Sequence, residues 1–466
     1  MTLIQAYSLS KPPIDLMVKN ISYLLLWVML LSCSSDDGVP VEAGLPDETG
    51  FLGEIEWIRN FGGSGSEEAR SIIATSDGGF AVFGFTNSMD GELVGKSSAV
   101  NDYWLLKFDA DGNLQWNKTY GGSKDDRGQA VVQTNDGGYA VVGYAMSDDG
   151  DGSQNQGFHD QWVLKLTSSG EIQWEKSFGF AGHDHAYDLV QTDDGGFFFS
   201  GFLDIVASGG AGGTEKGYFL ANHGVGEFWG TKIDAQGNLE WRKFFGGTNN
   251  DRAYGLVTSF DGGYIMTGFS ESDDTDISNT KGSYDFWVVK VDSGGTLVWE
   301  RSFGGTGIDV SYDIERTTDN AYVVVGHSFS TDQDIGSNHG ESDIWLIKIS
   351  ESGELIWENS YGGAAFENAN SVKQTEDGGF LIAGNSRSND QDLDENLGEN
   401  DIWVIKTDAQ GELEWQKSLG GTGIDFGYDV IDYGQYGILL VGQSGSPDFN
   451  AESHKGGTDL VIIRIN

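Results

Sequence analysis

The chain has 466 residues, of which 72 are acidic and 27 are basic, and its formal net charge is −45. A surface this acidic repels nucleic-acid phosphates and anionic lipid headgroups, which excludes nucleic acid as an expected partner. The 70 glycines, the 5 prolines and the 12% of aromatic residues favour many short strands joined by tight turns over helices or a disordered polymer.

Residues 1–32 are predicted to be a signal peptide. The apolar run from Ile21 to Leu31 follows Lys19. This run is too short to span a bilayer but suits the hydrophobic region of a secretory signal. Met17 is an alternative start, because it removes a leader that contains two adjacent prolines. The mature protein is therefore expected to be exported.

The end of this segment, Leu30-Leu31-Ser32-Cys33, resembles a bacterial lipobox. The resemblance implies that Cys33 is lipidated and becomes the mature N-terminus, whereas the alternative is a free buried thiol. Cys33 is the only cysteine of the chain, so a disulfide within one chain is excluded. The run from Ser34 to Asp37 resembles export signals of surface-exposed Gram-negative lipoproteins. It implies a lipid anchor in the outer membrane and a position on the cell surface.

Residues 33–53 are predicted to combine the lipidated cysteine with a flexible acidic tether. They contain Pro40, Pro46 and many polar side chains. A flexible coil of about 20 residues spans roughly 25 Å, so the folded part of the chain can stand away from a membrane.

A sevenfold repeat governs the rest of the chain. The motif Gly-x-Leu/Ile-x-Trp recurs with its tryptophan at positions 57, 116, 174, 241, 299, 357 and 415. The spacings are 59, 58, 67, 58, 58 and 58 residues, and a period in this range is typical of solenoids or propellers. The repeat therefore predicts the architecture before any local propensity is considered.

Each repeat contains four strand-like runs. In the first repeat these runs are 71–74, 80–84, 102–107 and the segment around Trp116. An Asp-Gly-Gly sequence separates the first two runs and predicts a hairpin, since a type I′ turn needs positive φ at both central positions. Apolar residues fall on both faces of the third run. This pattern predicts small sheets that are sandwiched between neighbours.

The two ends of the array predict that it closes on itself. The strand of Trp57 has no preceding partner, and the strand from Asp459 to Arg464 lacks a successor. Pairing them completes a seventh sheet, whereas a solenoid would need polar caps at both ends. The expected fold is all-β: residues 54–466 form a single seven-bladed β-propeller with four-stranded blades, closed by the N-terminal strand pairing into the last blade.

These repeats resemble the tandem β-propeller repeats of bacterial surface proteins. The shared elements are the tryptophan, the double glycine, the Asp-Gly-Gly turn and the sequence Asp-x-Trp-x-x-Lys. The resemblance covers about residues 54–466 and implies the propeller fold. It implies little about activity, because propellers carry many unrelated functions.

Residues that recur in nearly every blade are interpreted as architecture. One basic residue recurs at the same position of every blade and forms a basic ring. We interpret these residues as ion-pair partners of the hairpin turns and not as a funnel for anions; they are Lys107, Lys165, Lys232, Lys290, Lys348, Lys406 and Arg464. The strand-opening carboxylates are expected to accept backbone amides; they belong to Asp102, Asp160, Asp285, Asp343, Asp401 and Asp459. Thirteen of the fourteen tryptophans occupy two repeat positions and are expected in the core.

One face of the propeller is the expected binding surface, because the double-glycine loops and the long loops both emerge there. Acidic runs in the long loops supply the oxygen ligands that calcium prefers. The candidate ligands are Asp149, Asp151, Asp274, Asp276, Asp332, Asp334, Asp390, Asp392 and Asp394. Solvated acidic loops are the alternative. A dedicated EF-hand is excluded, since Glu395 stands where that loop requires glycine.

The third blade departs from the repeat on this same face. Phe180 replaces the second glycine, Ile205 replaces a serine, and Glu227 replaces the strand-opening aspartate. The ligand-binding candidates near these changes are His159, His183, Asp184, His185 and His223. Neutral imidazoles with a carboxylate can bind zinc or another transition metal, or act as acid and base. Local drift around an insertion of about nine residues is the alternative interpretation.

The expected function is that of a surface-anchored lipoprotein. Its propeller would be a non-catalytic binding or scaffolding module for an extracellular protein or glycan, with calcium as the candidate cofactor. The sequence shows no nucleophile elbow, P-loop or zinc-protease helix. The alternative is an extracellular polysaccharide hydrolase or lyase that uses His183, His185 and Glu227. A third hypothesis is a purely structural component of a surface layer.

Overall fold

The computed structural model describes residues 53–93, 95–204, 226–449 and 454–466. Every described strand belongs to the unit formed by residues 51–466. The predicted signal peptide, Cys33 and nearly all of the tether lie outside the described residues, as do Ile205 and His223. Among the described residues, no helix has the length and apolar character needed to cross a membrane.

The described strands form seven antiparallel sheets of four strands, named blades 1 to 7. Blade 1 contains β2 (Glu67–Ala74), β3 (Phe80–Thr86), β4 (Asp102–Phe108) and β5 (Leu114–Tyr120). Blade 2 contains β6 (Asp126–Gln133), β7 (Tyr139–Ala145), β8 (Asp160–Leu166) and β9 (Ile172–Phe178). Blade 3 contains β10 (Asp184–Gln191), β11 (Phe197–Asp204), β12 (Gly226–Ile233) and β13 (Leu239–Phe245).

Blade 4 contains β14 (Asp251–Thr258), β15 (Tyr264–Ser270), β16 (Asp285–Val291) and β17 (Leu297–Phe303). Blade 5 contains β18 (Asp309–Arg316), β19 (Ala321–Ser328), β20 (Asp343–Ser350) and β21 (Leu355–Tyr361). Blade 6 contains β22 (Glu367–Gln374), β23 (Phe380–Ser386), β24 (Asp401–Thr407) and β25 (Leu413–Leu419). Blade 7 contains β26 (Asp425–Asp432), β27 (Ile438–Ser444), β28 (Asp459–Ile465) and β1 (Ile55–Phe61), with a 3-10 turn at Gly434–Tyr436.

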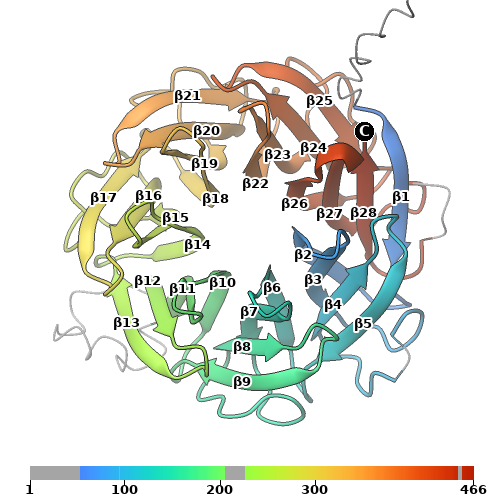
Figure 1. Ribbon diagram of the computed structural model, residues 1–466. Coiled ribbons are helices and arrows are strands. Elements are labelled where there is room, and N and C mark those ends of the chain that lie inside the picture. The colour runs from blue at the N-terminus through green and yellow to red at the C-terminus, as the bar shows by residue number, and fades with distance from the viewer. Residues whose placement is uncertain (1–52, 94, 205–225, 450–453) are drawn as a thin grey trace, which may run out of the picture. The chain divides into compact units, whose positions relative to one another are not determined.

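The first strand closes the ring. β1 runs antiparallel to β28, with Trp57 opposite Arg464 and Phe61 opposite Leu460. Figure 1 shows β1 (blue) as the outermost strand beside β28 (red). The predicted seven-bladed propeller, with closure by the N-terminal strand, is therefore confirmed.

The middle strands of each blade are buried on both faces. Every residue of β3 and β4 is buried, and the third-strand tryptophans of six blades are fully enclosed. Phe83 of blade 1 packs in one cluster with Val141 and Trp162 of blade 2. Each sheet therefore has an apolar neighbour on both sides, which explains continuous apolar runs in place of alternation.

The recurring charges are structural, as the sequence predicts. Each lysine of the basic ring lies within 3.0 Å of a hairpin aspartate, in the pairs Lys107–Asp77, Lys165–Asp136, Lys232–Asp194, Lys290–Asp261, Lys348–Asp319 and Lys406–Asp377. Arg464 pairs with Glu56 instead, at 2.7 Å. The lysine side chains are buried, so these pairs neutralise charges that would otherwise be costly inside the protein.

The strand-opening aspartates hold the loops that precede them. Asp160 accepts a hydrogen bond from the Gln156 N–H at 2.6 Å. The same contact over four residues recurs at Asp285, Asp343, Asp401 and Asp459. Asp102 instead pairs with Lys96 at 3.2 Å. The interpretation of these aspartates as architecture is thus confirmed for five of the six.

Each innermost strand carries a β-bulge at the same position. In β2 the pairing with β3 shifts register between Ala69 and Ser71, which leaves Arg70 as the extra residue. The corresponding shifts in the other innermost strands leave Gln129, Tyr187, Tyr254, Tyr312, Asn370 and Tyr428 as the extra residues. Bulges re-aim side chains, and here they direct one residue per blade towards the axis of the ring.

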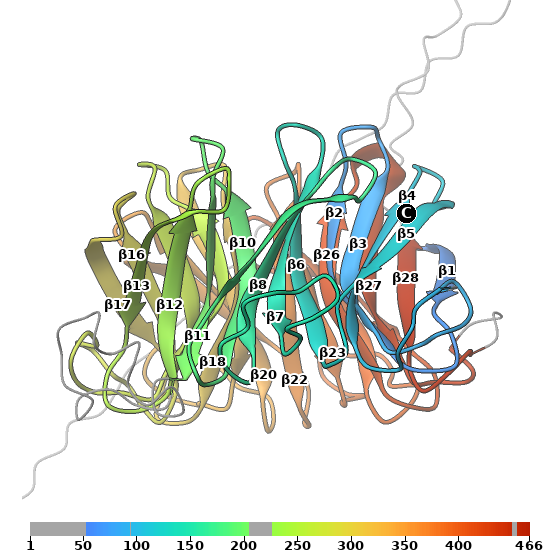
Figure 2. The same ribbon diagram turned by 90° about the horizontal axis from the view of Figure 1, so that it is seen from below.

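The two rims of the ring differ. Figure 2 shows the propeller from the side, with short hairpins on one rim and longer loops on the other. The longer rim carries the double-glycine loops and the connections between second and third strands, as expected from the alternation of antiparallel strands. We call this rim the loop face.

Candidate functional site

The acidic loops of the loop face brace the double-glycine loops. In blade 2, Asp149 accepts the Ser123 N–H at 2.8 Å and Asp151 accepts the Gly121 N–H at 3.2 Å. The same two contacts are made by Asp274 and Asp276, by Asp332 and Asp334, and by Asp390 and Asp392. Asp394 accepts a hydrogen bond from the Gln416 amide.

These contacts supply a structural role for the aspartates that were predicted as calcium ligands. A carboxylate that accepts a backbone N–H stabilises a tight loop without any ion. Among the described residues, they do not gather into a cluster of three or more acidic groups around one point. Calcium binding by these loops stays a prediction.

A cluster of three histidines lies on the loop face at the junction of blades 2 and 3. His159 immediately precedes β8, His183 immediately precedes β10, and His185 is the second residue of β10. A parallel bridge pairs His159 with His183 across the junction. We call these residues the histidine cluster. Among the described residues, it is the one group of metal-ligating side chains whose donor atoms all lie within 4.8 Å of one another.

The ring nitrogens of the histidine cluster converge. The Nδ1 atoms of His159 and His183 are 2.8 Å apart, and His185 Nε2 is 3.3 Å from His159 Nδ1. Tyr144 stacks on His185 with centroids 3.8 Å apart, and Phe158 stacks on His183 at 5.1 Å. The aromatic neighbours therefore hold the imidazole planes in place.

Burial keeps two of these rings neutral. Burial, followed by the neighbouring His183, lowers the pKa of His159 to about 4. Burial also holds the pKa of His185 well below its usual value, with His159 as the next cause. Both rings therefore carry a free lone pair at neutral pH.

The other blade junctions of the ring are equivalent to this one by the sevenfold repeat, but they have different residues at the three positions. The bridge between blades 4 and 5 joins Tyr284 and Ile308, and the bridge between blades 6 and 7 joins Asn400 and Ile424. At the junction of blades 1 and 2, the corresponding residues are Asn101, Asp125 and Arg127. A histidine triplet at one junction of a repeated scaffold is a local specialisation and not a requirement of the fold.

Two of the remaining third-blade candidates, Asp184 and Glu227, do not join the histidine cluster. Asp184 accepts the Phe180 N–H at 2.6 Å and is an internal brace. Glu227 is buried at the next junction, where its carboxylate and that of Asp251 both face the Gly246 turn. The structure thus brings His183 and His185 together with His159 but separates Glu227 from them. The predicted catalytic set of His183, His185 and Glu227 is not assembled at one point.

Phe180, one of the departures noted from the sequence, has a packing role. Its ring stacks on Trp229 with centroids 5.9 Å apart, and the Arg242 guanidinium lies 4.6 Å from its centroid. In other blades the corresponding tryptophan N–H donates to an acceptor thirteen residues later, such as Glu175. The change to Phe180 therefore accompanies the change to arginine at position 242.

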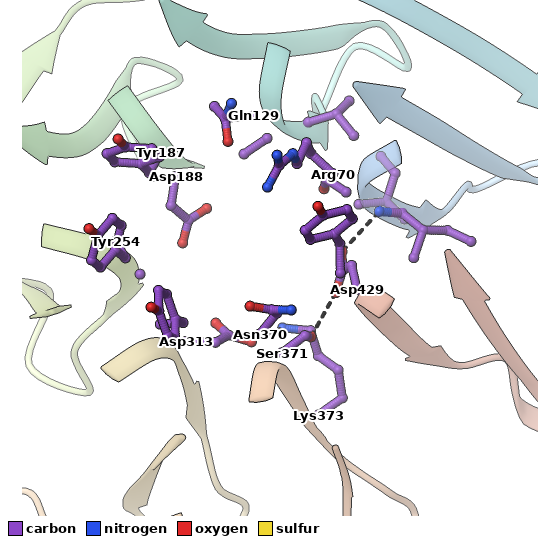
Figure 3. A pocket seen from close by; sticks show the side chains of 18 residues that line it. Arg70, Gln129, Tyr187, Asp188, Tyr254, Asp313, Asn370, Ser371, Lys373 and Asp429 are labelled. Carbon is purple, nitrogen blue, oxygen red and sulfur yellow. Dashed lines mark hydrogen bonds and ion pairs between the residues drawn. The ribbon is translucent and has the colours of Figure 1, made fainter. Parts of the chain in front are cut away.

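The axis of the ring contains a polar cavity that the sequence analysis missed. Figure 3 shows the side chains that line it, among them Arg70, Tyr187, Asp188 and Lys373. Its volume is about 200 Å³, and the bulged residues of the innermost strands supply much of its wall. We call it the axial cavity. The sequence contains a signal for this cavity, because the residue type at the bulge differs from repeat to repeat while the residues that flank it are similar.

Carboxylates of the axial cavity connect adjacent blades. Asp188 accepts the Leu256 N–H, Asp313 the Val372 N–H, and Asp429 the Ile72 N–H, each at 2.9 Å. Lys373 lies 3.3 Å from Asp313. Burial, followed by the Asp313 carboxylate, raises the pKa of Asp188 to about 7. The cavity therefore holds three carboxyl groups beside the cations of Arg70 and Lys373.

Aromatic side chains continue from the axial cavity across the loop face. Ring centroids are 5.0 Å apart between Tyr187 and Tyr254 and 5.1 Å apart between Tyr254 and Tyr312. Tyr312 is followed by His327 at 5.7 Å, and His327 by Phe329 at 5.7 Å. We call these five residues the aromatic arc. It joins blades 3 to 5 through ring contacts, with His327 buried between Tyr312 and Phe329.

These features define a seven-bladed propeller with a specialised loop face. No family model matches the sequence. The regulatory protein FlaEY of Caulobacter vibrioides is 25% identical over 150 residues. The match covers 30% of this chain and only 16% of that protein's length.

Several solved structures are similar in fold. The WD40 domain of Pan2 from Neurospora crassa is 11% identical, with 87% of this chain and 90% of that chain covered and a TM-score of 0.48. YCF48 bound to D1 peptide is 9% identical, with coverage of 88% and 94% and a TM-score of 0.45. BamB from Moraxella catarrhalis is 11% identical, with coverage of 86% and 100% and a TM-score of 0.34. These similarities concern the fold alone.

Proposed function

We propose that this protein is a lipoprotein of the outer membrane, exposed at the cell surface, whose propeller is a non-catalytic binding module for an extracellular protein. The observation that carries the proposal is the distribution of exposed apolar side chains. The loop face exposes Met89, Phe158, Ile308, Phe329, Leu397 and Ile424, which belong to five different blades; of these, only Ile308 and Ile424 share a repeat position.

The other exposed apolar side chains follow the repeat. Leu239, Leu297, Leu355 and Leu413 all occupy the Leu/Ile position of Gly-x-Leu/Ile-x-Trp, so they are features of the blade. Apolar and aromatic side chains that interrupt a polar surface are typical of interface anchors. Their spread over five blades suits a broad protein surface better than a single sugar unit.

Charge defines the kind of partner. The chain has a net charge of −45, and the axial cavity adds the carboxylates of Asp188, Asp313 and Asp429 beside the cations of Arg70 and Lys373. An acidic face attracts a basic partner and rejects acidic ones. The partner is therefore a protein with a basic surface and apolar side chains that meet the loop face.

Site-specific photo-crosslinking on intact cells tests the face. A photoreactive phenylalanine analogue would replace Phe158 or Phe329 on the loop face, and Val298 or Ile356 on the opposite rim as matched controls. We expect a discrete crosslinked protein from the loop-face positions alone, with a yield that falls as salt increases. Equal products from both rims would overturn the proposal. Binding to a glycan array in place of a protein product would identify a glycan-binding module.

Anchoring is tested separately. Metabolic labelling with a fatty acid should mark the wild-type chain and not the Cys33→Ser variant. Protease applied to intact cells should then remove the propeller. Labelling that survives in the Cys33→Ser variant would contradict the lipid anchor, and protection of the propeller would contradict surface exposure.

The polysaccharide hydrolase or lyase alternative has less structural support. It relied on Glu227 beside His183 and His185, and the Glu227 carboxylate faces the junction of blades 3 and 4 instead.

A further inference from the structure

We propose that His159, His183 and His185 form a site for one divalent transition metal ion, for which zinc is the best match. Imidazole nitrogen is a preferred ligand of zinc, copper and nickel, whereas calcium and magnesium require oxygen. The inference is independent of the proposed partner, because it rests on the donor atoms within this chain.

The geometry of the three nitrogens fits a tetrahedral ion. With zinc–nitrogen distances of about 2.0–2.1 Å, two ligands of a tetrahedral site lie about 3.4 Å apart. The His185 Nε2 to His159 Nδ1 distance is 3.3 Å, and the His159 Nδ1 to His183 Nδ1 distance is 2.8 Å. All three nitrogens lie within 4.8 Å of one another. Binding of an ion therefore requires the closest pair of nitrogens to separate from 2.8 Å towards about 3.4 Å and the rings to reorient around it.

Hydrogen bonds among the rings do not explain their convergence. A neutral imidazole carries one N–H donor and one acceptor nitrogen. His159 Nδ1 faces both His183 Nδ1 and His185 Nε2, and a single proton at that point serves only one of the two contacts well. A cation bound between the rings accepts all three lone pairs at once.

A group behind one of the rings matches the usual support of a metal site. Metal-bound histidines generally direct their second nitrogen to an oxygen, which orients the ring. His185 Nδ1 lies 3.2 Å from the Tyr187 hydroxyl, whereas His159 Nε2 lies 4.0 Å from Asp125 Oδ2, which is too far for a hydrogen bond. Asp125 accepts a hydrogen bond from Arg127, so the nearby guanidinium charge is balanced.

Three protein ligands leave one position of a tetrahedral ion open. The imidazoles are only partly buried, and Phe158, which stacks on His183, is 56% exposed. The open position therefore faces solvent on the loop face. Water, or a side chain from a molecule that contacts this face, would complete the coordination.

The test uses a soluble chain from residue 34, which contains the whole closed ring. Metal-free protein is titrated with zinc, and cobalt is used as a spectroscopic probe of four-coordinate geometry. We expect one equivalent to bind, and the intense visible bands of tetrahedral cobalt to appear. His183→Asn or His159→Asn should lower zinc affinity at least 100-fold. Asparagine occupies the corresponding positions at 250 and 101, so the fold accommodates it there.

Matched controls use histidines elsewhere on the loop face. His339→Asn and His454→Asn remove imidazoles that lie beside Asp343 and Asp459, and they should leave zinc affinity unchanged. Each variant is also melted in chelator against the wild type in chelator, which separates loss of metal from loss of fold. Absence of a stoichiometric site, or equal affinity in wild type and His183→Asn, would overturn the proposal.

A measurement on the unmodified sequence keeps the test valid if a variant does not fold. The chain has seven histidines, which can be labelled with nitrogen-15. Zinc should shift the ring signals of three histidines and leave four unchanged. Shifts spread evenly over all seven would indicate non-specific binding and count against the site.

Discussion

Trp57 and Arg464 lie opposite each other across the pairing of β1 and β28, although 407 residues separate them (464 − 57). Trp57 also packs with the apolar cluster that joins blade 7 to blade 1. The ring is therefore held shut by backbone hydrogen bonds and side-chain burial between the two ends of the array. Loss of this contact exposes the edge of β28.

Removal of β1 should open the propeller. A chain that begins at Gly62 lacks this strand, so we expect its midpoint of thermal unfolding to fall by roughly 10 °C relative to the chain from residue 34. Addition of a peptide covering residues 53–61 should recover part of the loss. Differential scanning calorimetry measures both effects, and an unchanged midpoint without β1 would contradict closure.

The acidic loops should contribute to stability without any ion. Asp274→Ala removes the acceptor of the Thr248 N–H, and we expect the free energy of unfolding in chelator to fall by about 1 kcal/mol. The neighbouring exposed Asp273→Ala is the control and should be neutral. A calcium-dependent increase of the melting temperature that disappears in Asp274→Ala would show instead that these loops are calcium sites.

The hairpin ion pairs should matter because the lysine is buried. Asp319→Ala leaves Lys348 without its carboxylate partner at 2.7 Å, and we expect a loss of roughly 1–2 kcal/mol at pH 7. The contact with Lys348 holds the pKa of Asp319 below its usual value. The stabilisation is thus present at neutral pH and is lost as the pH falls below about 4.

The control for this ion pair is Asp193→Ala. Asp193 is an exposed carboxylate one position before the hairpin aspartate of blade 3. The free energy of unfolding is measured with urea at pH 7 and pH 3. The difference in this free energy between wild type and Asp319→Ala should be smaller at pH 3. A constant difference would mean that the aspartate acts through the turn alone.

Asp188 should make the propeller less stable as the pH rises. Its folded pKa is about 7 because of burial and the nearby Asp313, whereas an unfolded aspartate has a pKa of about 3.9. Between these values the folded chain binds more protons than the unfolded chain, so the free energy of unfolding falls with increasing pH.

Asp188→Asn removes this titration and keeps an oxygen for the Leu256 N–H. Between pH 5 and pH 8, we expect the wild type to lose roughly 1–2 kcal/mol more than the variant. Urea unfolding across this range provides the measurement, and Asp193→Asn should follow the wild-type profile. Parallel curves for wild type and Asp188→Asn would contradict a raised pKa.

Part of the candidate site could be predicted from the sequence. His159, His183 and His185 lie near the departures of the third blade in sequence, and the structure brings them together. Asp184 lies in the same segment and Glu227 is itself a departure, yet Asp184 accepts the Phe180 N–H and Glu227 faces Gly246. Proximity in sequence does not determine the face towards which a side chain of a strand points.

The architecture of this protein can be predicted from local sequence patterns. The periodic tryptophans and the hairpin turns are local patterns that recur along the chain, and each end of the array has part of a blade. Such patterns can be recognised without knowledge of contacts between distant residues. The contacts at the blade junctions and along the axis, in contrast, depend on how the strands pack in three dimensions. His159 meets His183 because two blades pack together, and Tyr187 reaches the axial cavity because a bulge shifts the register of β10. Both depend on contacts between strands, which no single repeat encodes.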